Sequence, residues 1–187
     1  MDRNTVKITS KKTLFEGKFL KFILTTYIDS SGKTREWESF ERINCEGIVV
    51  IIPWTEKDET LLIRQFRPPV NGYVVEFPAG LNDKGGSLED AARRELLEET
   101  GYSAEKMIYL TEGPLSSGAS GEILTAFLAT GLRFEGFAGR DEAEEMEVLK
   151  IPVRDLDSRL SALRSAGNYI DLKIFGLIEL ARKYLPF

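Results

Sequence analysis

Three glutamates near the middle of the chain have a spacing that could bind a metal ion. Glu95, Glu98 and Glu99 stand in an i, i+3, i+4 relation, so a helix would carry all three on one face. Like charges this close repel one another unless a cation neutralises them, and Mg²⁺ prefers carboxylate oxygens, water and phosphates. Arg94, one turn before Glu98, could hold that side chain in place. The alternative is a solvated charged face with one weak ion pair.

The same segment contains the end signals of a helix. Ser87 is a good N-cap, with Asp90 at the capping-box position, and Gly101 is a typical helix stop. We therefore expect a helix that ends at about Thr100 and follows a polar loop containing Gly85 and Gly86.

Apolar, β-branched runs separated by turn signals predict strands on both sides of this helix. Residues 21–28 and 34–42 flank a turn-forming cluster and predict a hairpin. The other predicted strands are residues 47–53, 60–66, 73–77, 107–111, 123–129 and 146–151, with a loop after residue 77. Two more helices are expected, at residues 153–166 and from Asp171 onward. A mixed β-sheet flanked by helices is the natural packing for this α/β order.

The composition excludes several classes of function. The chain has no histidine, so a His base, a His metal ligand and a Ser-His-Asp triad are all excluded. A formal net charge of -5 argues against a nucleic-acid partner, and the apolar runs are too short to span a membrane. The single cysteine, Cys45, excludes an internal disulfide and fits a reducing compartment, so the cytoplasm is the expected location.

The helix and its preceding loop resemble the Nudix box, G-x5-E-x7-R-E-U-x-E-E-x-G-U, where U is a bulky apolar residue. The residues that match this pattern in register are Gly80, Arg94, Glu95, Leu96, Glu98, Glu99, Gly101 and Tyr102. One position departs, because the box expects a glutamate where this chain has Gly86. In the family that glutamate supports the loop and is not the main metal ligand. Its loss is therefore expected to affect the order of the loop and the activity, and it does not change the assignment to the family.

The resemblance extends beyond the box to the ADP-sugar (ADP-ribose) pyrophosphatases. The hairpin around Trp37, the run 65–69 (Gln-Phe-Arg-Pro-Pro) and the run 76–81 (Glu-Phe-Pro-Ala-Gly-Leu) are similar to that family's pattern. The resemblance implies a Nudix fold with an N-terminal β-hairpin subdomain. It further implies an N-terminal region at residues 1–44 for dimerisation and base binding, and a catalytic domain at residues 45–187.

The resemblance also implies a metal site formed by residues of the box. The resemblance implies that Glu95, Glu99 and the main-chain carbonyl of Ala79 bind Mg²⁺, with Mn²⁺ as an alternative, and that Glu98 shares a metal. Two or more ions would neutralise a diphosphate and hold the attacking hydroxide in line with one phosphorus.

Other residues would contact the substrate or move its protons. Arg67 would bind the diphosphate, with Arg42 as a second candidate, because a guanidinium offers permanently charged bidentate recognition. Glu76 either contacts the substrate or is a solvated strand-edge residue. The loop residues Gly118 and Ser120 would border the sugar or its phosphate.

The proton acceptor is expected in the acidic run at residues 141–145, which on its own would be a solvated loop. By alignment on Glu147, Glu144 is the first candidate and Glu142 the second, with Glu98 next if both fail.

Two aromatic residues would hold the nucleobase. The resemblance places Trp37 and Phe19 of different subunits on either side of the base, in a homodimer with swapped N-terminal hairpins. Stacking on an aromatic ring tolerates any base, since every base has a π-face. Phe19 could instead close an apolar contact at the dimer interface.

The sequence thus predicts hydrolysis of a nucleoside-diphosphate sugar, most simply ADP-ribose to AMP and ribose 5-phosphate. The alternatives are another sugar nucleotide such as GDP-mannose or ADP-glucose, a nucleoside-triphosphate or cap hydrolase, a non-catalytic sensor of nucleotide sugars, and a purely structural domain. Retention of Glu95, Glu98 and Glu99 favours an enzyme over a sensor.

Overall fold

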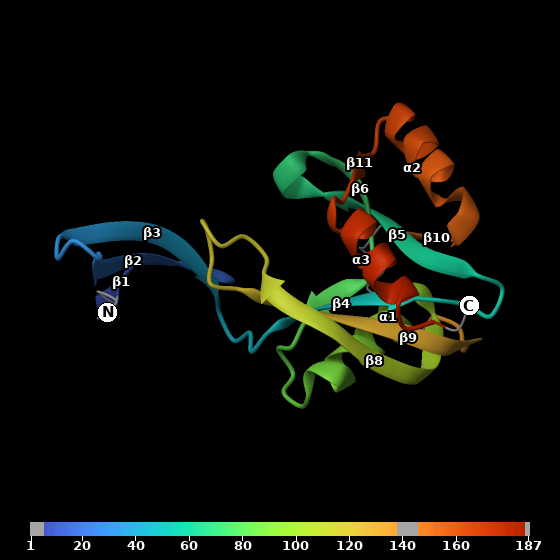
Figure 1. Ribbon diagram of the computed structural model, residues 1–187, viewed down its shortest axis with the longest axis horizontal. Coiled ribbons are helices and arrows are strands. Elements are labelled where there is room, and N and C mark those ends of the chain that lie inside the picture. The colour runs from blue at the N-terminus through green and yellow to red at the C-terminus, as the bar shows by residue number, and fades with distance from the viewer. Residues whose placement is uncertain (1–5, 138–145, 186–187) are drawn as a thin grey trace.

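The computed structural model describes residues 6–137 and 146–185, and the described residues form three sheets and three α-helices. The N-terminal sheet projects away from the other two, which lie together with the helices in the rest of the molecule (Figure 1). In this part of the chain, no helix is both long and apolar enough to cross a membrane.

The N-terminal sheet is antiparallel, in the order β1-β2-β3. Its strands are β1 (Lys7–Glu16), β2 (Leu20–Ile28) and β3 (Thr34–Arg42). The predicted hairpin is confirmed as β2 and β3. The first strand was not predicted, because its sequence is rich in lysine and has no apolar run. It forms a strand by pairing along β2, from Lys7 opposite Ile28 to Glu16 opposite Lys21.

The rest of the molecule contains two four-stranded mixed sheets where a single sheet was expected. One sheet has the order β7-β4-β9-β8, made of β7 (Ala79–Leu81), β4 (Ile48–Pro53), β9 (Ile123–Phe134) and β8 (Tyr102–Pro114). The other has the order β10-β5-β6-β11, made of β10 (Met146–Pro152), β5 (Glu59–Arg67), β6 (Gly72–Glu76) and β11 (Tyr169–Ile170). The α/β class is confirmed. The loop predicted after residue 77 was partly wrong, because Ala79 to Leu81 pair with β4 as a short strand.

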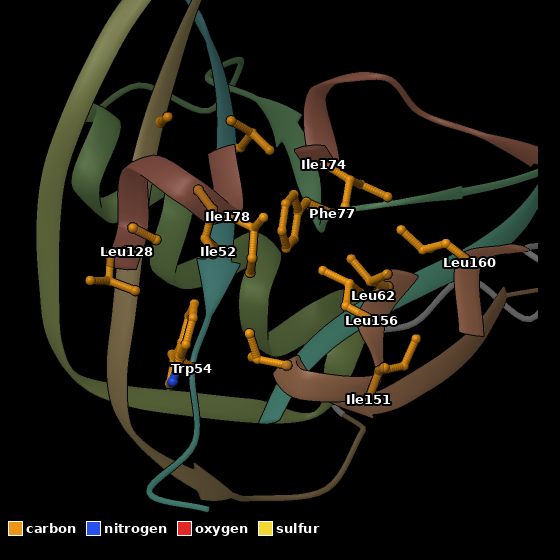
Figure 2. Close-up of a cluster of buried hydrophobic side chains, with 14 of the residues drawn as sticks. Ile52, Trp54, Leu62, Phe77, Leu128, Ile151, Leu156, Leu160, Ile174 and Ile178 are labelled. Carbon is orange, nitrogen blue, oxygen red and sulfur yellow. The ribbon is translucent and has the colours of Figure 1, made fainter. Parts of the chain in front are cut away.

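The strand β4 separates two apolar clusters, and all six of its residues are buried. Val50 and Ile52 face the core between the two sheets, where Phe77 and Ile174 also pack (Figure 2). Val49 and Ile51 face the opposite way, toward the first helix. The alternation of side chains along one strand thus anchors helices on both sides of the sheet.

The helix α1 (Leu88–Thr100) has the predicted ends. The side chains of Ser87 and Asp90 form the capping box, and Gly101 closes the helix with a φ of 76°. Its Ala91, Ala92 and Leu96 pack against β4. This apolar contact fixes which side of α1 carries the box glutamates.

The last two helices begin later than predicted. Residues Val153–Asp155 form a 3-10 turn, so α2 (Leu156–Ser165) starts after them. The helix α3 (Lys173–Arg182) starts two residues after Asp171, whose carboxylate accepts a hydrogen bond from the Lys173 backbone N–H and so caps the helix from outside.

Candidate active site

The first glutamate of α1 lies directly against the backbone of β7. The carboxylate of Glu95 occupies the space where a Cβ at position 80 would be, so any other residue there would displace the Glu95 side chain. The glycine that opens the box therefore serves a packing need, namely close approach of Glu95 to the main chain.

Glu99 is held by the same short strand. Its Oε2 accepts a hydrogen bond of 2.9 Å from the backbone N–H of Ala79. Loss of hydration on burial raises the pKa of Glu99 to about 8; the Ala79 hydrogen bond opposes the rise and the nearby charge of Glu95 adds to it. The site therefore keeps a carboxylate in surroundings that penalise its ionised form.

Arg94 holds a different glutamate from the one expected. Its Nη2 donates to Glu95 Oε1 at 2.8 Å and to the carbonyl of Leu81 at 2.7 Å, whereas its Nε is 3.9 Å from Glu98. Glu98 lies 3.5 Å from Lys84 Nζ, and its side chain is 33% exposed against 15% for Glu95. Arg94 therefore orients Glu95, and Glu98 lies farther out.

The donor set of α1 suits a hard divalent cation. In residues 6–137 and 146–185, no three acidic side chains converge into a ready-made metal cluster. Burial nevertheless raises the pKa of Glu95 as well; Arg94 opposes that shift and Glu98 adds to it. These carboxylates repel one another and are partly dehydrated, and a bound divalent cation would stabilise their ionised forms.

A cavity of about 450 Å³ brings five of the predicted residues together. These residues are Arg42, Arg67, Glu76, Ala79 and Glu99. Arg67 Nε lies 2.8 Å from Glu76 Oε1, and only 12% of the Glu76 side chain is exposed, so the solvated-edge interpretation of Glu76 was wrong. A larger cavity of about 630 Å³, beside Trp54 and Arg154, includes none of these residues.

A chain of polar contacts joins Arg42 to the loop between β8 and β9. Arg42 Nε lies 2.7 Å from Glu122 Oε1, and the buried Ser120 donates a hydrogen bond of 3.2 Å to Glu122 Oε2. Trp37 Nε1 donates to the carbonyl of Gly118 at 3.0 Å. Ser120 and Gly118 thus position Glu122, Arg42 and Trp37.

The remaining predicted residues lie elsewhere. Trp37 on β3 is 51% exposed, Phe19 in the turn between β1 and β2 is 67% exposed, and neither lines the cavity. Glu142 and Glu144 lie outside the described residues.

Four residues near the site were not singled out from the sequence. Gln65, Asp171 and Lys173 line the cavity, and Glu122 pairs with Arg42. Gln65 is two positions from Arg67, so strand alternation could have found it. It is buried, and its Nε2 has no hydrogen-bond partner among the residues described. No sequence signal pointed to Asp171 and Lys173.

Comparison with known proteins places this geometry in a family. The model of the NUDIX domain matches residues 46–170. The chain belongs to the Nudix family. It is 36% identical to an ADP-sugar pyrophosphatase of Mus musculus, over 90% of this chain and 84% of that one. It is 33% identical to an ADP-ribose pyrophosphatase of Bacillus subtilis (strain 168), over 80% of each chain.

A solved structure agrees with the fold. A crystal structure of an ADP compounds hydrolase superposes with a TM-score of 0.78 at 24% identity, and covers 96% of this chain and 94% of that chain. This likeness shows that the two chains share a fold.

Proposed function

We propose that the protein hydrolyses the diphosphate bond of nucleoside-diphosphate sugars, with ADP-ribose cleaved to AMP and ribose 5-phosphate. The observation that carries this proposal is the cavity in which the box residue Glu99 faces the Arg67–Glu76 pair. Carboxylates for a metal and a guanidinium for a phosphate meet there, as the chemistry of a diphosphate requires. The names of the two pyrophosphatase relatives support the same substrate class.

Each residue then has a defined task. Glu95, Glu99 and the Ala79 carbonyl would hold Mg²⁺, or Mn²⁺ in its place, with Glu98 sharing an ion. When bound, these ions would neutralise the diphosphate and activate the attacking water.

The other side chains bind the substrate and transfer its proton. Arg67, oriented by Glu76, and Arg42, oriented by Glu122, bind the phosphate oxygens. Glu144, with Glu142 second, accepts the proton of the attacking water.

The N-terminal region, residues 1–44, would act as the dimerisation and base-binding part of a homodimer with exchanged hairpins. Every residue of β1 is exposed, and so are large apolar side chains such as Phe15 on this strand and Phe19 in the turn after it. An exposed apolar face of this kind favours a protein partner. Trp37 and the partner subunit would then enclose the base. The lone Cys45 supports a cytoplasmic location.

A substrate panel tests the proposal. Purified protein with Mg²⁺ is given ADP-ribose, ADP-glucose, GDP-mannose, UDP-glucose or ATP, and the products are separated by chromatography. We expect fastest cleavage of ADP-ribose and none in EDTA. Preference for another sugar nucleotide would correct the substrate, whereas tight binding of ADP-ribose without turnover in Mg²⁺ would favour the non-catalytic sensor.

A further inference from the structure

Two residues of the cavity come from the far end of the chain. Asp171 follows β11, and its backbone N–H donates to the carbonyl of Val75 at 2.9 Å, which continues the parallel pairing of β11 with β6. Asp171 therefore lies next to the end of β6, where Glu76 stands. Lys173 begins α3, and the next residue, Ile174, is fully buried in the core beside Phe77 (Figure 2). Both residues thus have fixed positions in the cavity wall.

Asp171 and Lys173 form a tight charge pair. Lys173 Nζ lies 2.5 Å from Asp171 Oδ2, and the Lys173 backbone N–H donates to Asp171 Oδ1 at 3.0 Å. Only 14% of the Asp171 side chain is exposed, against 38% for Lys173. An ammonium has three donors and a carboxylate about four acceptor sites, so the pair keeps free donors and acceptors side by side.

Three of the elements next to the cavity are neighbours in one sheet, in the order β5, β6 and β11. Arg42, from the N-terminal sheet, belongs to the same strand as Trp37. Arg67 on β5 and Glu76 on β6 both act electrostatically on Glu99. Asp171 and Lys173 follow β11, the edge strand of that sheet. With the base near Trp37 and the diphosphate at Arg67, as the proposed function has them, the distal sugar would extend toward the Asp171–Lys173 pair.

We propose that Asp171 and Lys173 bind the hydroxyl groups of the distal sugar and so determine which diphosphates are cleaved efficiently. This inference rests on the proposed function. Adjacent hydroxyls each need a donor and an acceptor, and a lysine–aspartate pair offers both without a net charge. A purely structural role, in which Asp171 caps α3 and Lys173 neutralises it, predicts no effect on substrate choice.

The test compares two substrates that share the scissile bond. ADP-ribose carries the sugar hydroxyls, and the β-methyl ester of ADP lacks them. The variants are Asp171→Asn, which retains an oxygen to cap α3, and Lys173→Met, with Lys183→Met near the end of the same helix as the matched control. We expect kcat/KM for ADP-ribose to fall about 10–100-fold in each variant, the usual effect of losing a hydrogen bond to a charged group.

The methyl ester should react at the wild-type rate with every variant, and melting temperatures should stay close to that of the wild type. If kcat/KM falls by the same factor for both substrates, or falls for neither, the pair does not recognise the sugar and the inference fails. If the wild-type enzyme cleaves neither compound, the proposed function itself fails, which separates the two outcomes.

Discussion

Glu99 combines two properties that ordinarily oppose each other in a folded protein. It is a carboxylate that has lost much of its hydration, and it accepts a hydrogen bond from the neutral backbone N–H of Ala79. A group in these surroundings is stabilised either by a proton or by a metal cation. The metal-free protein must therefore hold a proton there at pH values at which a free glutamate is ionised.

The first prediction concerns the stability of the metal-free protein. Glu99 ionises near pH 8 when folded, against 4.5 in the reference state. Between these values the folded state keeps a proton that the unfolded state has lost, so the free energy of unfolding falls as pH rises. In EDTA, the free energy of unfolding of Glu99→Gln should therefore rise above that of the wild type by about 1–3 kcal/mol as the pH increases across this range. Above pH 8 this difference should not grow further.

Urea unfolding of both proteins at several pH values measures this difference in the free energy of unfolding. Saturating Mg²⁺ should remove the advantage of the variant, because only the wild type gains the full metal site. A difference between the two proteins that is the same at pH 5 and pH 8 would show that ionisation of Glu99 does not destabilise the folded state.

At the scale of elements, the loop before α1 explains the departure from the Nudix box. Gly85 and Gly86 have φ values of +76° and +92°, a region that residues with a Cβ rarely adopt. The side-chain amide of Asn82 donates to the carbonyl of Gly86 at 3.2 Å and fixes this path. A glutamate at position 86 would be strained, and Asp83 is the loop carboxylate near Arg94, at 3.7 Å.

Placing a glutamate at position 86 should consequently destabilise the protein. We expect Gly86→Glu to lower the free energy of unfolding by about 1–3 kcal/mol, the scale of a strained backbone conformation, and to leave kcat no higher than in the wild type. Gly86→Ala is the matched control, since it has the same backbone strain without the charge. A Glu variant that is more stable than the Ala variant would indicate that the new carboxylate reaches Arg94.

Elements specified by local signals were predictable, and elements specified by distant pairing were not. Ser87 and Gly101 define both ends of α1 within the helix itself, so the sequence sufficed. The strand β1 exists because β2 offers a partner, and its own residues carry no strand pattern. Asp171 reaches the cavity because β11 pairs with β6, whose residues are far away in the chain.

At the scale of the whole molecule, no other described element forms a layer over the N-terminal sheet. Ile23 is its one buried large apolar side chain among the described residues, and Phe15 and Phe22, which are cross-strand neighbours, are 67% and 43% exposed. A three-stranded sheet needs an apolar face packed against something to be stable in water. A second copy of the chain would provide that layer.

Light scattering should therefore show a dimer. Phe15→Ser combined with Phe22→Ser should produce monomers, because both side chains lie on one face of the sheet, whereas Lys12→Ser on the same strand should leave the dimer intact. A wild-type protein that is monomeric at micromolar concentration would rule out the exchanged-hairpin assembly and, with it, a base site shared between subunits.

The most direct test of the account is the turnover of ADP-ribose in saturating Mg²⁺ by the wild type, Glu95→Gln and Glu99→Gln. Both substitutions keep the shape of the side chain and remove its charge, so the fold should persist. If these glutamates hold the metal, the wild type releases AMP and ribose 5-phosphate, and each variant loses about 100-fold or more in kcat. Near-normal kcat in either folded variant would contradict the placement of the active site on α1.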